Sequence, residues 1–293
     1  MVYILHHFKR IVTFDISLYE VGPRDGLQNL SYTIPTETKV RFIETLHAAG
    51  LCDLEVGSFV NPKHVPTMAD TADVFAQIKH LDGDLGVLVP NKRGFERAVE
   101  VGAKKFNVFF SPSEDFNLLN FGYTRKKIVA NYQEILEDVP KDDVRVYLSS
   151  IFGHPISNTI LQDAIQDADS LGNTIVLCDT IGAAYPISVK QVVQLAFDNS
   201  DADIAMHLHF GTKQENRMIM NIEAAYFQGI RMFDCSIGGL GGCPFISDSG
   251  GNLPTEIIVE WAESQNIDCG IHSRDLKDAL SFVENEIKEG IIC

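Results

Sequence analysis

The sequence lacks several features that would point away from an ordinary globular protein. None of its apolar runs approaches the length of about 18 residues that a transmembrane helix needs. Basic residues are scarce, because 24 Lys and Arg against 40 Asp and Glu give a formal net charge of −16. This charge argues against a nucleic acid or an anionic membrane as partner. With 45% hydrophobic and 22% charged residues, the composition is close to the globular average.

Cysteine is sparse and widely spaced. No C-x-x-C pair occurs among the six cysteines, which are Cys52, Cys178, Cys235, Cys243, Cys269 and Cys293. Neither a zinc ribbon nor a small disulfide framework is therefore predicted. We expect reduced thiols, with all except Cys243 acting as small apolar residues in the core. The first ten residues also lack the order of a signal or transit peptide, which favours a cytoplasmic location.

Short apolar, β-rich runs alternate with longer helical patterns along most of the chain. The runs predict strands at residues 14–19, 52–56, 85–89, 105–110, 144–149, 174–178, 204–209 and 231–236. The helical patterns follow at residues 36–49, 71–79, 94–101, 125–137, 159–170, 189–197, 214–227 and 255–264. Eight such β-then-α units over about 250 residues predict an α/β fold, a (β/α)8 TIM barrel. A doubly wound open sheet is the competing fold.

No linker-like composition or internal repeat divides the sequence. One catalytic domain over residues 1–293 is therefore predicted. The barrel would occupy about residues 14–265, and a C-terminal helical tail would occupy residues 266–293.

Polar residues gather where the predicted strands end. Active sites of (β/α)8 barrels lie at the carboxyl ends of the strands, so these residues are the candidates for chemistry. They are Glu20, Arg24, Asp25, Glu55, Asn91, Asp179, His207, His209, Cys243 and Asn252.

His207 and His209 are the most informative pair. Residues two apart on a strand face the same side, so both imidazoles can reach one metal ion. Asp25 and Asn252 would add oxygen ligands, and such a nitrogen and oxygen set suits Mg²⁺ or Mn²⁺ while tolerating Zn²⁺ or Co²⁺. Two simpler alternatives stay open: unrelated histidines near a strand end, and an Asp25 that only caps the turn at residues 23–26.

A glycine-rich stretch at residues 238–244 surrounds the thiol of Cys243. Glycines allow such a loop to move and its backbone to approach a ligand closely. The stretch lacks the Lys-Ser/Thr of a phosphate-binding P-loop, which disfavours nucleotide hydrolysis. Because a thiol is mostly protonated at neutral pH, Cys243 is a candidate proton donor as well as a nucleophile.

These motifs resemble those of the 3-hydroxy-3-methylglutaryl-CoA lyase family, which belongs with isopropylmalate synthase to the TIM-barrel metallolyases. The resemblance extends from about residue 16 to residue 264. It is carried by the segments 20–29 (EVGPRDGLQN), 54–59 (LEVGSF), 89–91 (VPN), 179–182 (DTIG), 207–209 (HLH) and 239–244 (GLGGCP). The last segment is similar to the signature of the lyases rather than of the synthases.

The resemblance implies a ligand set, catalytic residues and a reaction. The positions that match the divalent-metal ligands are Asp25, His207, His209 and Asn252, and those that match catalytic residues are Arg24, Glu55, His207 and Cys243. The implied reaction is a retro-Claisen cleavage of 3-hydroxy-3-methylglutaryl-CoA to acetyl-CoA and acetoacetate. The implied partner is an acyl-CoA substrate, no organic cofactor is expected, and a homodimer or higher homo-oligomer is predicted.

The sequence departs from the family in two places. Phe210 follows the histidine pair where the family usually has Asp, and residues 150–155 (SIFGHP) replace a Gly-Cys-Pro segment. His154 within that segment is predicted to be a surface histidine. Both departures affect the prediction of the acyl substrate more than the prediction of the metal site. The cations nearest the predicted mouth are Lys39, Lys63, Lys92 and Arg93, most of which should be solvated.

Three alternative functions therefore stay open. A related metal-dependent lyase or aldolase could act on another hydroxyacyl-CoA or oxo acid. A non-catalytic barrel could bind a metabolite, although such a binder would not need Arg24, Glu55 and Cys243 together. A zinc hydrolase built on the two histidines would leave the cysteine loop without a role.

Overall fold

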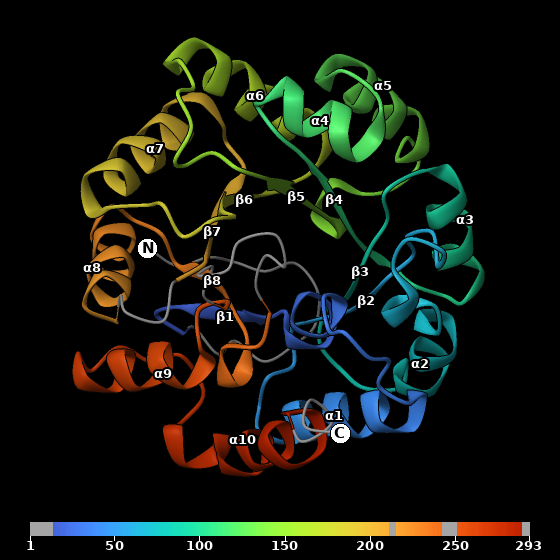
Figure 1. The fold of residues 1–293 in the computed structure, drawn as a ribbon. Helices are drawn as coiled ribbons and strands as arrows, with labels where there is room; N and C mark the ends of the chain where they lie inside the picture. Colours follow the sequence, from blue (N-terminus) through green and yellow to red (C-terminus); the bar gives the residue numbers. More distant parts are fainter. Residues whose placement is uncertain (1–13, 211–214, 242–250, 289–293) are drawn as a thin grey trace.

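The computed structural model describes residues 14–210, 215–241 and 251–288. Within these ranges eight parallel strands form a closed barrel, in which each strand pairs with the next and β8 pairs with β1 (Figure 1). The strands are β1 (Ser17–Glu20), β2 (Leu54–Ser58), β3 (Leu85–Leu88), β4 (Lys105–Phe110), β5 (Val144–Leu148), β6 (Thr174–Asp179), β7 (Asp203–Leu208) and β8 (Met232–Cys235). The predicted (β/α)8 barrel is confirmed.

Helices form a ring around the barrel (Figure 1). They are α1 (Thr36–Ala48), α2 (Thr71–Ile78), α3 (Lys92–Glu100), α4 (Glu114–Phe121), α5 (Arg125–Ile135), α6 (Asn158–Leu171), α7 (Pro186–Asn199), α8 (Glu215–Phe227), α9 (Thr255–Ser264) and α10 (Lys277–Phe282). In the described part of the chain, none of these helices has the length and apolarity to cross a membrane.

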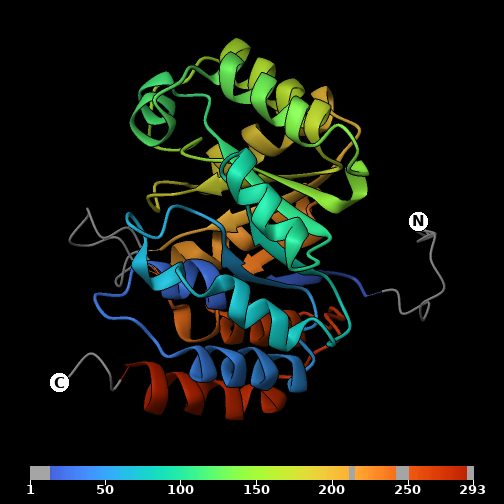
Figure 2. The same cartoon turned by 90° about the vertical axis from the view of Figure 1, so that its right-hand side faces the viewer.

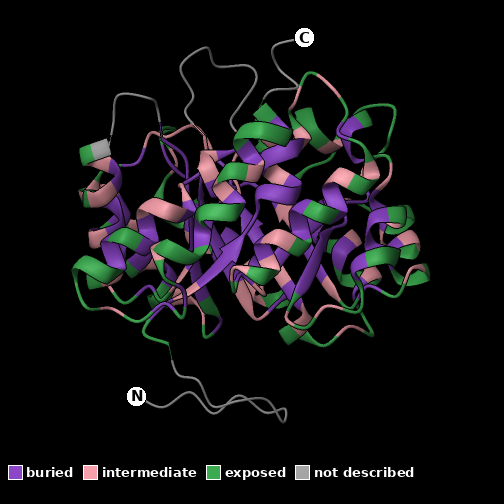
Figure 3. Ribbon diagram, turned by 90° about the horizontal axis from the view of Figure 1, so that it is seen from below, coloured by how far each residue is buried: buried purple, intermediate pink, exposed green. Residues whose placement is uncertain are grey.

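The strands are the most buried part of the molecule, and Figure 3 shows them as its purple centre. All residues of β2 and β3 are buried. Helices cover the outer face of the sheet and side chains fill its inside, so a strand such as β3 (LGVL) reads as a continuous apolar run instead of an alternating one. This is why the sequence pattern located such strands.

The first strand begins later than predicted, at Ser17 instead of residue 14. The preceding backbone turns to another partner, because the N–H groups of Asp15 and Ile16 donate to the carbonyl of Asp268 at 2.8 and 3.2 Å. Phe14 is also 45% exposed. The apolar pattern could not distinguish pairing with the barrel from pairing with the segment after α9.

One helix begins earlier than predicted, and another was not predicted. Helix α7 begins at Pro186 instead of residue 189, since proline is well suited to the first turn of a helix, where its missing N–H costs nothing. Helix α4 was not predicted. It has eight residues and buries only Asn117, so it has almost no apolar periodicity to detect.

The chain after α9 forms the predicted C-terminal extension, in which α10 lies against α1 (blue and red helices, Figure 2). The rings of Phe42 and Phe282 stack with centroids 5.7 Å apart. Beyond α10 the helical path continues to Lys288, and Glu286 Oε2 accepts a bond from Arg41 Nη2 at 2.8 Å. The extension therefore completes the helical ring beside α1.

Candidate active site

The predicted metal ligands come from three segments that meet at the carboxyl ends of the strands. Asp25 lies in a π-helical turn, Gly22–Gly26, directly after β1. His207 is near the end of β7, and His209 follows that strand and forms an isolated antiparallel bridge with Asn252. Closure of the barrel thus brings residues together that are more than half the chain apart.

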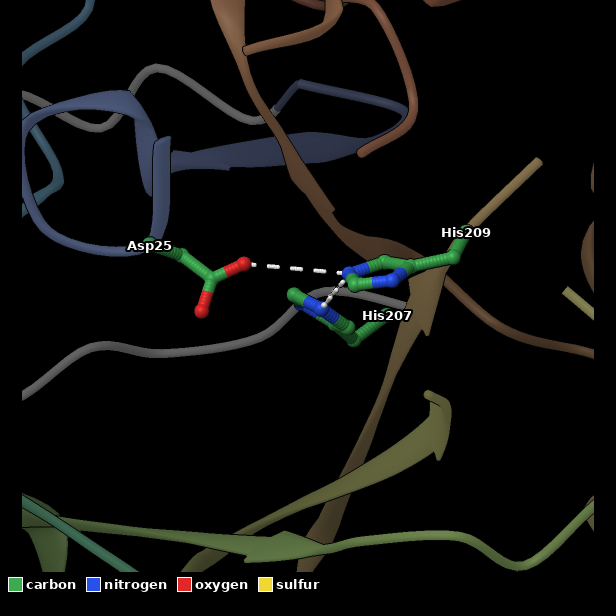
Figure 4. Close-up of side chains that lie close together, drawn as sticks. All are labelled: Asp25, His207 and His209. Atoms are coloured by element: carbon green, nitrogen blue, oxygen red, sulfur yellow. Dashed lines mark hydrogen bonds and ion pairs between the residues drawn. The ribbon is translucent and has the colours of Figure 1, made fainter. Parts of the chain in front are cut away.

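Three side chains converge on one point (Figure 4). One ligand atom each of Asp25, His207 and His209 lies within 4.8 Å of the other two. The Nε2 atoms of the two histidines are 3.0 Å apart, and His209 Nε2 is 3.7 Å from Asp25 Oδ2. Imidazole nitrogens and a carboxylate that face one point form a typical divalent-cation site.

Asn252 lies beside this cluster. Its Nδ2 donates to Asp25 Oδ2 at 2.9 Å and to the carbonyl of Leu240 at 2.8 Å. Its Oδ1 is buried and has no hydrogen-bond partner within the described ranges. A buried amide oxygen without a partner is costly, and a cation shared with the cluster would satisfy it. The four predicted ligands therefore fit a divalent cation.

Arg24 links this cluster to Glu55. Its guanidinium forms ion pairs with Glu55 and with Asp25. Glu55 Oε1 accepts a further bond from Asn107 Nδ2 at 2.7 Å. Burial opposes ionisation of Asp25, but the charge of Arg24, the hydrogen bond from His209 and the nearby His207 together outweigh it and hold the pKa of Asp25 well below its usual range. Asp25 therefore stays anionic at neutral pH, as its predicted role of metal ligand requires.

Burial raises the pKa of Glu55, although Arg24 and Asn107 act in the opposite direction. The guanidinium of Arg24 also lies over the ring of Tyr147, 5.8 Å from its centroid. Contacts with Glu55, Asp25 and Tyr147 thus fix the position of the Arg24 guanidinium. Its permanent positive charge lies next to the predicted metal ligands.

Sequence reasoning missed the residues that support His207. Asp234 on β8 places Oδ2 3.1 Å from His207 Nδ1, and its other oxygen is paired with Arg145 on β5. Burial lowers the pKa of His207, but Asp234 and the charge of Asp25 together outweigh it and the net shift is upward. Polar residues within otherwise apolar strands are the signal that could have located Asp234, Arg145 and Asn107.

Two of the polar residues at the ends of the predicted strands have structural roles. Asn91 caps α3, because its side chain accepts a bond from the N–H of Gly94 at 3.0 Å. Asp179 accepts bonds from the N–H groups of Ala183 and Ala184 at 2.7 and 2.9 Å. Both stabilise loops around the site. Their position at strand ends did not distinguish them from the polar residues that form the cluster.

Cys243, the predicted proton donor, lies outside the described residues. The part of its loop that is described contacts the site through Gly241, which has a φ of 101°. A Cβ atom at Gly241 would lie 2.5 Å from Asn252 Nδ2. Only glycine fits this backbone conformation so close to a predicted ligand.

The remaining described cysteines are buried, except Cys52. Cys178, Cys235 and Cys269 are buried, as predicted, and Cys293 lies outside the described residues. Cys52 is only partly buried, so the prediction that it fills the core is wrong. It sits between α1 and β2, where the chain passes along the rim of the barrel.

The residues that distinguish this sequence from the family have different surroundings. Phe210 is buried, whereas His154 is exposed as predicted. Lys39, expected near the mouth, is buried and its Nζ contacts the carbonyl of Thr67 and Asp70 Oδ1, each at 2.5 Å. Lys39 therefore holds α1 against the segment before α2. Lys92 lies on the surface 3.5 Å from Glu134.

Comparisons with known proteins agree with these features. The model of the HMGL-like family matches residues 15–283. Hydroxymethylglutaryl-CoA lyase YngG of Bacillus subtilis is 36% identical over 284 residues, 93% of either chain. A Pseudomonas aeruginosa protein named 3-hydroxy-3-isohexenylglutaryl-CoA/hydroxy-methylglutaryl-CoA lyase is 35% identical over 90% of either chain. The crystal structure of the Bacillus subtilis HMG-CoA lyase superposes with a TM-score of 0.86, covering 94% of this chain and 95% of that one, at 34% identity.

Proposed function

Because the chain belongs to the HMGL-like family, we propose that it is a divalent-metal-dependent lyase that cleaves 3-hydroxy-3-methylglutaryl-CoA to acetyl-CoA and acetoacetate. The enzyme class, a carbon–carbon lyase, is confirmed by the relatives named HMG-CoA lyases. One observation carries the proposal: Asp25, His207 and His209 converge on one point beside Arg24. A cytoplasmic location and a homo-oligomeric state stay predictions.

The proposed reaction breaks a C–C bond next to a tertiary hydroxyl group. A divalent cation held by Asp25, His207, His209 and Asn252 would make the hydroxyl proton easier to lose. We propose Mg²⁺ or Mn²⁺, since the donor set contains only nitrogen and oxygen. The leaving fragment is a thioester enolate, and Arg24 provides a fixed positive charge for its developing negative charge. Glu55 orients Arg24 through their ion pair.

His207 is proposed both as a ligand and as the acceptor of the hydroxyl proton. Asp234 holds its Nδ1, which leaves Nε2 facing the site. Nε2 has one lone pair, so His207 could accept the proton only while Nε2 is not bound to the cation.

Replacing His207 therefore provides a test of both roles. The His207→Gln variant should bind Mn²⁺ about tenfold or more weakly and should also lose turnover. Calorimetric titration with Mn²⁺ and a turnover assay at saturating metal measure the two effects. Unchanged Mn²⁺ affinity with lost turnover would remove His207 from the ligand set.

Cys243 is proposed to donate the proton that the enolate carbon gains. The Cys243→Ala variant should keep Mn²⁺ affinity and substrate affinity while its turnover falls by about 10² or more. Turnover close to that of the unchanged protein would exclude Cys243 from the mechanism. The Cys269→Ala variant, which removes a buried thiol on the segment after α9, is the matched control.

Product analysis tests the proposed reaction directly. The metal-stripped protein is incubated with 3-hydroxy-3-methylglutaryl-CoA, with and without added Mg²⁺ or Mn²⁺. Acetoacetate and acetyl-CoA in equal amounts, formed only with metal, would support the proposal. Absence of both products at every metal concentration would contradict it.

A different acyl group is the second candidate, and Phe210 favours it. This buried aromatic residue directly follows His209, where the family usually has Asp. One of the relatives is named for an isohexenylglutaryl-CoA as well as for the methyl compound. Comparing kcat/KM for 3-hydroxy-3-methylglutaryl-CoA with kcat/KM for thioesters that carry longer 3-substituents distinguishes the two candidate substrates. The candidate fails if the methyl compound is the best substrate.

A further inference from the structure

We propose that the amino-terminal end of the barrel carries a second metal site, formed by His47, Cys52 and Asp82, which binds Zn²⁺. One imidazole nitrogen, the thiol sulfur and one carboxylate oxygen lie within 4.8 Å of one another. Cys52 precedes β2 and Asp82 precedes β3, whereas the active-site histidines lie where β7 ends. In a parallel barrel this places the two sites at opposite ends.

The end of α1 brings His47 and Cys52 together. The N–H of Gly50 donates to the carbonyl of His47 at 3.0 Å, and the N–H of Leu51 donates to the carbonyl of Leu46 at 3.1 Å. These two bonds form a Schellman motif, which ends the helix and turns the chain sharply. The backbone therefore reverses within a few residues, so that Cys52 lies beside the last turn of α1.

The loop between α2 and β3 brings Asp82 to the same place. Gly83 has a φ of 100°, and a Cβ atom at this position would lie 2.1 Å from the carbonyl oxygen of Cys52. The two segments are thus in close backbone contact, which only glycine permits. His47 Nε2 is 2.7 Å from Asp82 Oδ1 and 3.1 Å from the carbonyl oxygen of Asp82. The backbone, and not only flexible side chains, fixes this arrangement.

The donor atoms differ from those of the active site and select a different metal. Thiolate and imidazole favour Zn²⁺, whereas Mg²⁺ and Mn²⁺ prefer oxygen-rich sets. Tetrahedral zinc with Zn–S of about 2.3 Å and Zn–N or Zn–O of about 2.0–2.1 Å requires ligand atoms about 3.3–3.6 Å apart. His47 Nε2 and Asp82 Oδ1 are 2.7 Å apart and all three ligand atoms lie within 4.8 Å of one another, so side-chain rotations that move these atoms by about 1 Å would give this geometry. Three protein ligands leave a fourth position for the Asp82 carbonyl or for water.

The site is accessible and has few barriers to loading. The side chain of Asp82 is 79% exposed and that of His47 is 21% exposed, so a hydrated ion can reach both. Binding requires the thiol of Cys52 to give its proton to solvent, after which the thiolate binds the cation. A bound ion would cross-link the end of α1 with the starts of β2 and β3. Zn²⁺ should therefore stabilise the folded chain.

Cobalt substitution tests the site by a spectroscopic signal that the active-site ligands cannot produce. The chain is stripped with a chelator and titrated with Co²⁺, and absorption in the near ultraviolet reports thiolate bound to cobalt. We expect this absorption in the unchanged protein and in the His209→Ala variant, where the active-site cluster is disrupted. It should disappear in Cys52→Ser and persist in the matched control Cys269→Ser.

Further variants distinguish this thiolate from that of Cys243. The absorption should persist in Cys243→Ala, and the Co²⁺ affinity that it reports should fall about tenfold or more in His47→Asn. Loss of the absorption in Cys243→Ala, or its survival in Cys52→Ser, would overturn the proposal. Its absence from the unchanged protein would do so as well. Circular dichroism of each variant without metal checks that it is folded.

A stability measurement provides a second readout that does not depend on lyase activity. Added Zn²⁺ should raise the Tm of the His209→Ala variant, in which only the second site has its full ligand set. The same addition should leave the Tm of the His209→Ala/Cys52→Ser double variant unchanged. Equal shifts in both would contradict binding at Cys52, whatever the outcome for the proposed reaction.

Discussion

Asp234 lies outside the predicted ligand set but contacts one of its members, His207. It bonds to the ring nitrogen of His207 that points away from the cluster, and Arg145 neutralises its charge. Burial raises the pKa of Asp234, but Arg145 and His207 together outweigh it and the net shift is downward, so the carboxylate stays ionised. A carboxylate in this position fixes the tautomer of a metal-binding histidine and increases its basicity.

The Asp234→Asn variant should therefore bind Mn²⁺ about 10- to 100-fold more weakly. The amide keeps the shape of the side chain but removes the charge that favours His207 as a ligand. Calorimetric titration measures the affinity, and Asp203→Asn, at the exposed start of β7, is the matched control for loss of one carboxylate. Equal affinity in Asp234→Asn and the unchanged protein would show that this carboxylate does not tune the site.

At the scale of elements, Glu20 joins β1 to the segment between β8 and α9. Its fully buried carboxylate accepts bonds from the N–H of Gly22 at 2.8 Å, the N–H of Ile237 at 3.0 Å and the hydroxyl of Thr255 at 2.5 Å. Burial raises the pKa of Glu20 to about 7, against the opposing effect of these bonds. Glu20 therefore titrates near neutral pH in the folded protein.

This shift predicts a pH-dependent stability. The raised folded-state pKa means that the folded chain binds the proton more tightly than the unfolded chain does, for which the pKa is 4.5. The resulting stabilisation is fully present below pH 4.5 and is lost as the pH rises through about 7. A shift of this size corresponds to about 3 kcal/mol in the free energy of unfolding.

The Glu20→Gln variant should lack this contribution. Between pH 4.5 and pH 7 the unchanged protein should lose about 3 kcal/mol relative to Glu20→Gln, measured by urea unfolding at each pH. The exposed Glu37→Gln variant is the control for removal of one carboxylate. A constant difference between the two proteins across this range would contradict the raised pKa.

At the scale of the whole molecule, the net charge of −16 opposes capture of an anionic substrate. The proposed substrate, a CoA thioester, is strongly anionic, so its binding would have to depend on local features such as the proposed metal ion and Arg24. Salt shortens the range of this repulsion, from about 30 Å at 0.01 M to about 8 Å at 0.15 M.

We therefore expect kcat/KM for the CoA substrate to increase about twofold or more over this range of ionic strength. Initial rates at low substrate concentration, with metal held saturating, measure the effect. The corresponding pantetheine thioester, which lacks the nucleotide phosphates, should respond less. A fall in kcat/KM with salt would show that local cations dominate the approach of the substrate.

The sequence by itself determined the barrel, because eight buried parallel strands produce apolar runs at regular intervals and helices follow them. It also indicated which residues would meet, since strand ends with Asp25, His207 and His209 must lie at one end of the barrel. Element boundaries were less predictable. The start of β1 depends on Asp268, which lies more than 250 residues away in sequence.

Only the tertiary structure decided which polar residues share a site. Asn91 and Asp179 bond to nearby backbone, whereas Asp234 and Asn107 reach His207 and Glu55 from other strands. Sequence order contains no information about such contacts between strands, because they depend on how the barrel closes and on its register. The cluster of His47, Cys52 and Asp82 has the same origin: its residues belong to no motif and meet only where the end of α1 and the loops before β2 and β3 lie together.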